Sequence, residues 1–320
     1  MKIVVLDGYA LNPGDLSWEG FNNLGETIVY DKTQDKDIFE RSKEADILIT
    51  NKTPLKKEIL KKLPKLKYIG VIATGYDVVD LEYAKERNIP VTNVPSYGSE
   101  AVAQMVFAFI LNYTNRINIH HESIMEGQWQ KRGQFSYFAA PLTELKGKKL
   151  GVIGTGEIGQ KVSEIALAFG MEVLAYNRSK KEIFNNCSNF TWRPLSELFK
   201  SSDFISLHLP LTEETEGLVN KEKLELMKKN GYLINTARGK LVNEKDLAEA
   251  LNSERIAGAA LDVLSSEPPK ADNPLLTAKN CVLTPHIAWG AREARERLMN
   301  IAVNNLKAFL KGDRVNVVNN

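Results

Sequence analysis

Three side chains in the second half of the sequence, Arg238, Glu267 and His286, are of the types needed for acid–base chemistry on a small anion. An imidazole exchanges protons near neutral pH. A carboxylate such as Glu267 beside it would hold it protonated and oriented. The planar guanidinium of Arg238 matches a substrate carboxylate. Taken singly, Arg238 is better explained as a surface ion pair and Glu267 as a solvated turn carboxylate, so the set needs support from its place in the fold.

The sequence has four histidines, and His286 is the strongest candidate for a proton donor because it follows a predicted strand. His208 also ends a strand, but an imidazole there can equally serve in packing and hydrogen bonding. His120 and His121 are adjacent and lie away from any predicted strand end. Adjacent residues on a helix face different ways, so we expect these two at the surface or in an interface.

A glycine-rich turn, Gly154-Thr155-Gly156-Glu157-Ile158-Gly159, separates an apolar strand from an amphipathic helix. In dinucleotide-binding βαβ units with this spacing, the first glycine makes the turn, the second admits the pyrophosphate and the third lets the helix pack on the strand. The phosphates then bind the free N–H groups at the positive end of the helix dipole. Glycine-rich loops are often only turns, but here strands at 150–153 and 172–176 complete the unit. We therefore predict a dinucleotide cofactor.

Further polar residues come directly after predicted strands of the same region. In open α/β sheets, ligands bind beyond the carboxyl ends of the strands, on loops that a rigid scaffold positions. Hydride transfer needs a nicotinamide, a proton donor and a clamp for an anionic substrate held close together. We predict such an enzyme, with a nucleotide site that comprises the glycine loop and Asn177, Arg178, Ser179, His208, Leu209, Pro210, Thr236, Ala237, Arg238, Asp262 and His286.

Short apolar strands alternate with amphipathic helical stretches from the start of the chain. This alternation predicts the α/β class, with a parallel sheet covered on both faces. A first domain of about a hundred residues is an ordinary domain size. Its predicted strands lie at 3–6, 27–30, 47–50, 68–73 and 90–94, and its helices at 15–22, 37–42, 55–62 and 81–87.

The pattern changes at Ser99, which we expect to cap an almost wholly apolar, buried helix over 101–117 at the junction of two domains. An amphipathic helix over 291–310 is expected to return to the first domain. The predicted architecture is two doubly wound, Rossmann-like parallel-sheet domains with a cleft between them, formed by residues 1–98 plus 289–320 and by residues 99–288. Strands of the second domain are expected at 150–153, 173–176, 203–208, 231–236, 258–261 and 281–283.

The segment 118–148 is rich in aromatic residues and poorly periodic. Such side chains need a surface to cover. One interpretation is a loop packed on its own domain, and the other is an arm packed on a second subunit. The residues alone favour neither strongly.

Composition limits the partners and the compartment. The 42 basic and 40 acidic residues give a net charge of +2, which offers no electrostatic case for nucleic acid or an anionic membrane. Cys187 and Cys281 form no metal-binding pattern, so we predict no metal and a reducing compartment. The N-terminal apolar run is too short for a signal peptide, and no later stretch is long enough to span a bilayer. We expect a cytoplasmic protein.

The order of the motifs resembles the D-isomer-specific 2-hydroxyacid dehydrogenase family over essentially the full length. That family carries a dinucleotide fingerprint followed by H-x-P, N-T-A-R-G, D-V-x-x-x-E-P and P-H-I segments. The chain has GTGEIG, then HLP at 208–210, NTARG at 235–239, DVLSSEP at 262–268 and PHI at 285–287. The opening VVLDGYALNPGDLSW and the ending PHIAWGAREARERLMNIAVNNLKAF resemble the branch that reduces hydroxypyruvate to D-glycerate.

The resemblance implies an NAD(P)-dependent oxidoreductase acting on a small 2-keto or 2-hydroxy acid. His286 would donate a proton to the keto oxygen, Glu267 would keep that histidine protonated, and Arg238 would bind the carboxylate and polarise the carbonyl. Asp262 would meet the carboxamide end of the cofactor. The loop Ala73-Thr74-Gly75 would clamp the substrate carboxylate through its backbone.

The same resemblance implies roles for the larger parts of the chain. The first domain would be a flavodoxin-like substrate-binding domain and the second the dinucleotide-binding Rossmann domain, closing on each other about the junction helices. Members of the family are usually homodimers, which favours residues 118–148 as a dimerisation arm.

One departure from the family pattern bears on the cofactor. NAD-preferring members carry an acidic residue after the second strand of the nucleotide-binding unit, where it binds the ribose hydroxyls. This chain has Asn177-Arg178-Ser179-Lys180-Lys181 at that point. No carboxylate there repels a 2′-phosphate, and Arg178 can bind one. We predict a preference for NADP(H) over NAD(H). The alternative is that Arg178 and the two lysines form only a solvated basic turn, with no role in cofactor binding.

The residues leave alternatives for the substrate. We expect reduction of hydroxypyruvate, with glyoxylate as a second substrate that yields glycolate. No motif sets the side-chain pocket, so a D-lactate-type dehydrogenase on another 2-keto acid is the alternative, and Trp289 either lines that pocket or belongs to the core. A formate dehydrogenase of similar fold would lack the carboxylate that Glu267 supplies. From another class, a nucleotide-sensing corepressor shares the fold, although here the catalytic set is complete.

Overall fold

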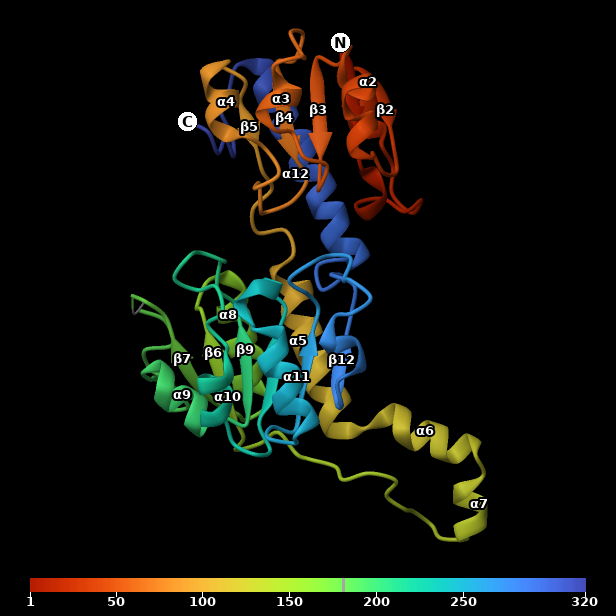
Figure 1. Ribbon diagram of the computed structural model, residues 1–320, viewed down its shortest axis with the longest axis vertical. Coiled ribbons are helices and arrows are strands. Elements are labelled where there is room, and N and C mark those ends of the chain that lie inside the picture. Colours follow the sequence, from red (N-terminus) through yellow and green to blue (C-terminus); the bar gives the residue numbers. More distant parts are fainter. Residues whose placement is uncertain (180–181) are drawn as a thin grey trace. The chain divides into compact units, whose positions relative to one another are not determined.

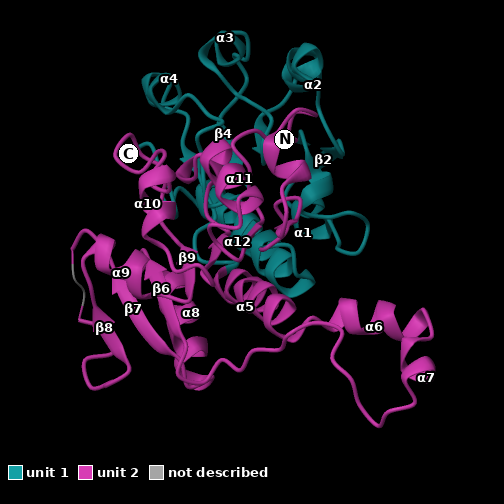
Figure 2. Ribbon diagram, turned by 60° about the horizontal axis from the view of Figure 1, so that its bottom comes forward, with its two compact units in different colours: residues 1–98, 289–320 teal, residues 99–288 magenta. Residues whose placement is uncertain are grey.

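The computed structural model describes residues 1–179 and 182–320. This part of the chain divides into two compact units, residues 1–98 with 289–320 and residues 99–288 (Figure 2). Each unit is built on one parallel sheet. The predicted α/β class with two doubly wound sheets is therefore confirmed. Lys180 and Lys181 of the predicted basic turn lie outside the described residues.

The first unit has a five-stranded parallel sheet in the order β2-β1-β3-β4-β5. Its strands are β1 (Lys2–Val5), β2 (Glu26–Val29), β3 (Ile47–Thr50), β4 (Tyr68–Val71) and β5 (Val91–Thr92). Its helices are α1 (Glu19–Asn22), α2 (Ile38–Ser42), α3 (Lys57–Leu60), α4 (Leu81–Glu86) and α12 (Arg292–Lys311), with 3₁₀ turns η1 (Gly8–Ala10) and η2 (Asp35–Asp37).

Alternation along β4 explains how both faces of this sheet are covered. Ile69 and Val71 join one buried cluster with Ile38, Leu60 and Ala84 of α2, α3 and α4. On the other face, the ring of Tyr68 packs against that of Phe309 on α12, with 4.8 Å between the ring centroids. Successive strand residues point to opposite faces, so α12 covers the face that α2, α3 and α4 leave open.

The second unit has a seven-stranded parallel sheet in the order β12-β11-β10-β9-β6-β7-β8 (Figure 1). Its strands are β6 (Lys149–Ile153), β7 (Glu172–Tyr176), β8 (Phe190–Trp192), β9 (Phe204–Leu207), β10 (Tyr232–Asn235), β11 (Gly258–Leu261) and β12 (Cys281–Leu283). The chain runs from β6 outward to β8 and then returns to the other side of β6 at β9. Ligands bind at such a switch point in open α/β sheets.

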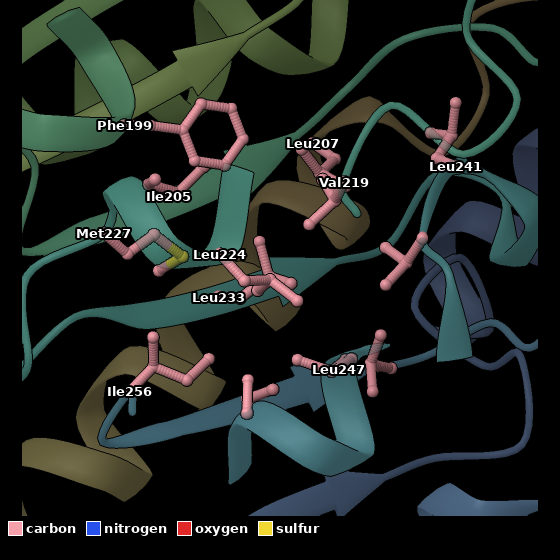
Figure 3. Close-up of a cluster of buried hydrophobic side chains, with 14 of the residues drawn as sticks. Phe199, Ile205, Leu207, Val219, Leu224, Met227, Leu233, Leu241, Leu247 and Ile256 are labelled. Carbon is pink, nitrogen blue, oxygen red and sulfur yellow. The ribbon is translucent and has the colours of Figure 1, made fainter. Parts of the chain in front are cut away.

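Helices cover both faces of this sheet. One buried cluster joins α5 (Ser99–Asn115) and α8 (Glu157–Ala168) to the strands. Figure 3 shows the cluster on the other face, where Phe199, Leu224 and Leu247 meet strand residues such as Ile205 and Leu233. These three come from α9 (Leu195–Ser201), α10 (Lys221–Leu226) and α11 (Glu244–Asn252). The unit also contains the 3₁₀ turns η3 (Gly239–Leu241) and η4 (Pro274–Thr277). Burial of each of these large apolar side chains stabilises the fold by about 1.5–3 kcal/mol. The strands therefore provide a rigid base for the loops at their ends.

The segment predicted to be irregular contains two helices, α6 (Ile117–Met125) and α7 (Gln128–Arg132). Neither helix has a buried residue, and Figures 1 and 2 both show them projecting from the sheet of their own unit. The Trp129 indole donates to the Gln134 carbonyl at 2.9 Å, and the Tyr137 hydroxyl donates to Ser123 at 3.1 Å. The segment therefore has its own local structure, although it has no buried face that would give its sequence a helical period.

The structure corrects several predicted boundaries. The first predicted helix, over 15–22, begins only at Glu19, because the Asn12 side chain holds the preceding residues in a turn through Gly14 and Leu16. Ser99 does not cap α5 but begins it, and its hydroxyl donates to Glu157 at 3.2 Å. The helix ends at Asn115 because Arg116 has φ +50. None of the described helices is long and apolar enough to cross a membrane.

Candidate active site

The glycine loop joins β6 to α8, and its three glycines differ in what surrounds them. Gly154 has φ +95, and a Cβ there would lie 2.5 Å from the carbonyl oxygen of His208. A Cβ on Gly159 would lie 2.0 Å from the carbonyl oxygen of Gly154. Around Gly156, in contrast, nothing lies within 4 Å of a Cβ position. Two glycines therefore close the turn, and the middle one leaves open space at the start of α8, as a bound pyrophosphate requires.

Two buried hydroxyls, one in this loop and one directly after β10, have no hydrogen-bond partner within the described residues. They belong to Thr155, inside the loop, and to Thr236, directly after β10. Buried polar groups are normally satisfied. Their state fits a polar ligand at the carboxyl ends of β6 and β10, so the residues present are compatible with a dinucleotide. The neighbouring side chains Ile158 and Leu209 pack instead against the hydrophobic clusters.

His208 follows β9 beside the glycine loop. Its Nε2 atom lies 2.9 Å from the Ser206 hydroxyl. Burial disfavours the imidazolium and lowers the pKa of His208 to about 3. A histidine that stays neutral at physiological pH is not a proton donor of the required kind. The structure thus favours packing and hydrogen bonding over direct chemistry for His208.

The residues after β7 form a turn in which the Asn177 amide donates to the Ser179 carbonyl at 2.8 Å. The Arg178 side chain points into solvent, 88% exposed. Its Nη1 atom lies 3.5 Å from Oε2 of Glu214, which comes from the loop after β9. Glu214 was not among the predicted site residues, although the run Glu213-Glu214-Thr215-Glu216 follows the H-L-P segment closely.

Arg238 lies at the surface in the turn after β10. The Asn235 side chain holds this turn, since it accepts from Ala237 N–H at 3.0 Å and donates to the Arg238 carbonyl at 2.9 Å. Gly239 next to it admits no side chain, because a Cβ would lie 1.9 Å from the backbone of Leu264. The guanidinium donates to the Ala237 carbonyl at 2.7 Å and is otherwise exposed, so it can meet an anion.

His286 and Glu267 are in direct contact. Nδ1 of His286 lies 2.6 Å from Oε2 of Glu267, and the other carboxylate oxygen accepts from Leu264 N–H at 3.2 Å. Both side chains are partly exposed, His286 to 27% and Glu267 to 36%. With Nδ1 committed to the carboxylate, Nε2 is the nitrogen that can exchange a proton with a ligand.

Asp262, at the end of β11, fastens the turn that carries His286. Its side chain is 1% exposed and accepts three hydrogen bonds, from the Thr284 hydroxyl at 2.5 Å and from Ile287 N–H and Ala288 N–H at 2.8 Å each. The His286 N–H donates to the Asp262 carbonyl at 2.8 Å. Asp262 therefore faces the turn that carries His286, and contact with a cofactor stays a prediction. Thr284 was not among the predicted site residues.

The predicted substrate loop Ala73-Thr74-Gly75 follows β4 in the first unit. It is tied to the residues after β5, because Asn93 donates to the Thr74 carbonyl at 2.8 Å and Val94 N–H donates to the Ala73 carbonyl at 3.0 Å. The loop lies at the carboxyl edge of its own sheet, which is where ligands bind in such sheets. Among the described residues, no cluster of three or more His, Cys, Asp or Glu side chains could hold a metal ion.

Comparison with known proteins identifies relatives over the whole chain. Residues 107–288 match the family model described as D-isomer specific 2-hydroxyacid dehydrogenase, NAD binding domain. The hydroxypyruvate reductase of Blautia hydrogenotrophica is 51% identical over 322 residues, covering 100% of both chains. The glycerate dehydrogenase of Methylorubrum extorquens is 38% identical over 320 residues, covering 99% of this chain and 98% of its own.

A solved structure gives the same match at the level of the fold. The acyclic imino acid reductase Bsp5, in complex with NADPH and D-Arg, superimposes with a TM-score of 0.83 at 35% identity. The match covers 99% of this chain and 100% of that one.

Proposed function

The chain belongs to the D-isomer specific 2-hydroxyacid dehydrogenase family, and from this premise we propose that it reduces hydroxypyruvate to D-glycerate with NAD(P)H. Glyoxylate, which would yield glycolate, is the proposed second substrate. The 51% identical relative named hydroxypyruvate reductase supports this choice within the family. The reaction consumes one hydride and one proton per keto acid, so the site must supply a proton as the hydride arrives.

The 2.6 Å contact between His286 and Glu267 carries the proposal. A negative carboxylate at Nδ1 stabilises the imidazolium and fixes the ring so that Nε2–H points away from Glu267. His286 then donates this proton to the keto oxygen. Arg238 binds the substrate carboxylate and polarises the carbonyl, and the backbone of Ala73-Thr74-Gly75 provides a second clamp.

The nicotinamide cofactor supplies the hydride. The open space at Gly156 and the first turn of α8 accept its pyrophosphate, and the hydroxyls of Thr155 and Thr236 acquire a polar partner. Asp262 supports the nicotinamide end of the site. We propose that NADPH is preferred over NADH, because Asn177 carries no charge and the exposed Arg178 guanidinium is suited to a 2′-phosphate.

The parts of the chain take distinct roles in this proposal. Residues 99–288 bind the nucleotide, and residues 1–98 with 289–320 bind the keto acid. Residues 118–148 form the arm of a homodimer, since they expose large apolar side chains such as Met125 and Phe135. The protein works in the cytoplasm.

Initial rates test the proposal directly. Hydroxypyruvate, glyoxylate and pyruvate are each assayed with NADPH and with NADH. We expect hydroxypyruvate with NADPH to give the highest kcat/KM, whereas pyruvate as the best substrate would indicate a D-lactate-type enzyme. His286→Asn should abolish turnover while NADPH still binds. Unaltered turnover in this variant would refute the proton-donor role.

A further inference from the structure

We propose that Glu214 is a cofactor-selectivity residue that opposes Arg178, because its carboxylate competes with the 2′-phosphate of NADPH for the Arg178 guanidinium. The inference rests on the proposed function only in placing the adenosine end of the cofactor at the end of β7. It concerns how strongly the site can prefer NADPH, and it assigns a role to a carboxylate outside the motif segments named above.

The pair joins two loops that flank the glycine loop. In the sheet order β9-β6-β7, Glu214 comes from the loop after β9 and Arg178 from the turn after β7, and β6 with its glycine loop lies between them. Nη1 of Arg178 and Oε2 of Glu214 are 3.5 Å apart. A nucleotide whose pyrophosphate occupied the glycine loop and whose adenosine end reached the turn after β7 would therefore meet both side chains.

Glu214 is held at this place by a structured turn. The Thr215 hydroxyl donates to the Pro210 carbonyl at 2.8 Å and accepts from Thr212 N–H at 2.8 Å. Glu216 N–H donates to the Thr212 carbonyl at 2.9 Å, which closes the turn around Glu214. Glu216, the next acidic residue of this turn, has a different cationic partner, because its Oε1 atom lies 3.7 Å from Nζ of Lys240.

The two charges favour different cofactors. A 2′-phosphate carries about −1.5 to −2 charges near pH 7. It gains from Arg178, but it must displace Glu214 from the guanidinium and then remain close to this like charge. The 2′-hydroxyl of NADH, in contrast, is a hydrogen-bond donor that a carboxylate accepts. Glu214 thus supplies from another loop the negative charge that Asn177 does not supply at the end of β7.

Because both side chains of the Arg178–Glu214 pair are exposed, substitutions there can change ligand binding without changing the stability of the fold. The side chains are 88% and 77% exposed, and ion pairs of this kind contribute little to stability. Substitution of either residue should leave the fold intact. Glu213, the exposed neighbour of Glu214, offers a matched control that removes the same charge one residue away.

Calorimetric titration of the full chain with adenosine 2′,5′-bisphosphate and with AMP tests the proposal without turnover. We expect Glu214→Gln to tighten binding of the bisphosphate by about three- to five-fold relative to AMP, the range set by an exposed ion pair. Glu213→Gln should change that ratio less than about two-fold. Equal effects of the two variants, or no tightening by Glu214→Gln, would overturn the proposal.

A second background separates this inference from the proposed cofactor preference. If Arg178→Ala does not weaken binding of the bisphosphate, the proposed NADPH preference fails. If Arg178→Ala weakens binding and the Glu214→Gln effect shrinks in that background, the competition for Arg178 is supported. An effect of Glu214→Gln that persists unchanged without Arg178 contradicts competition.

Discussion

Nδ1 of His286 lies 2.6 Å from Oε2 of Glu267, a separation typical of a charge-assisted hydrogen bond. The backbone of His286 is in the left-handed region, with φ +56, which residues other than glycine seldom adopt. Strained residues of this kind persist where surrounding contacts determine them, and they cluster at functional sites. The proposed role of His286 therefore depends both on its contact with Glu267 and on the turn that holds its backbone in this conformation.

Removal of the charge at position 267 tests this link. Glu267→Gln keeps an oxygen that can accept from the imidazole but no longer stabilises the imidazolium. We expect kcat for hydroxypyruvate to fall about 10²- to 10⁴-fold, the range of general acid catalysis. The Kd of NADPH, measured by fluorescence titration, should stay unchanged because Glu267 lies outside the glycine loop.

Glu244→Gln is the control for loop order. Glu244 accepts from the backbone and the hydroxyl of Ser265 at 2.7 Å each, so it holds the loop that carries Glu267 without touching His286. We expect a much smaller loss of kcat in this variant. Comparable losses in the two variants would assign the effect to loop disorder rather than to proton donation.

Asp262→Asn should damage both the catalytic turn and the fold. An amide oxygen can replace one carboxylate oxygen, but the amide nitrogen would then face an N–H donor of Ile287 or Ala288. We expect unfolding free energy to fall by about 1–3 kcal/mol, the cost of an unsatisfied buried donor. Urea denaturation measures this loss, and kcat should fall with it. Thr284→Val removes a single donor and should cost less; the reverse order would contradict this account.

Substitutions at two glycines of the loop should have different effects, one on the stability of the fold and the other on NADPH binding. Gly159→Ala places a Cβ 2.0 Å from a backbone oxygen, so we expect a large loss of stability. Gly156→Ala meets nothing within 4 Å and should leave the melting temperature almost unchanged, yet weaken NADPH binding at least about ten-fold by filling the space for the pyrophosphate. Thermal melts and fluorescence titrations of both variants check this. Tight NADPH binding by Gly156→Ala would contradict the proposed phosphate site.

His208 predicts a specific dependence of stability on pH. Its pKa is about 3 in the folded chain and about 6.5 when unfolded, so between these values the unfolded chain binds a proton that the folded chain does not. Stability should therefore fall as pH decreases below about 6.5, by up to about 2 kcal/mol between pH 7 and pH 5. His208→Gln can still bond to Ser206 but cannot titrate, so its urea-derived stability should vary less over this range. Equal slopes would contradict burial as the cause.

The sheets could be predicted from the sequence because buried parallel strands form continuous apolar runs. The strand at Gly258–Leu261 is buried throughout and was predicted with its observed ends. The strand at Phe190–Trp192 was missed, because it has three residues and only Phe190 is buried. The helices of the 118–148 segment were missed because an exposed element has no buried face to impose a period.

The sequence indicated candidate residues for the site but not the directions in which their side chains point. Motif order and strand ends made His286, Glu267 and Arg238 candidates, since functional loops follow strands in this fold, and the structure brings His286 and Glu267 into contact. The sequence did not indicate that Asp262 points at the turn of His286. Nor did it indicate that Glu214 meets Arg178, because this contact joins loops that are 36 residues apart and lie on either side of β6. Such contacts depend on the sheet order, which local patterns do not contain.

The exposed apolar side chains of the arm predict the oligomeric state. Met125, Phe135 and Phe138 are 73%, 97% and 71% exposed, and burial in a partner would remove this apolar surface from water. We expect the protein to be a dimer by light scattering, and the double variant Phe135→Ser/Phe138→Ser to be largely monomeric at micromolar concentration. Leu276→Ser removes an apolar side chain that is 46% exposed outside the arm and should leave the dimer intact. A monomeric wild-type chain would refute the arm, whereas a dimer that survives the double substitution would place the interface elsewhere.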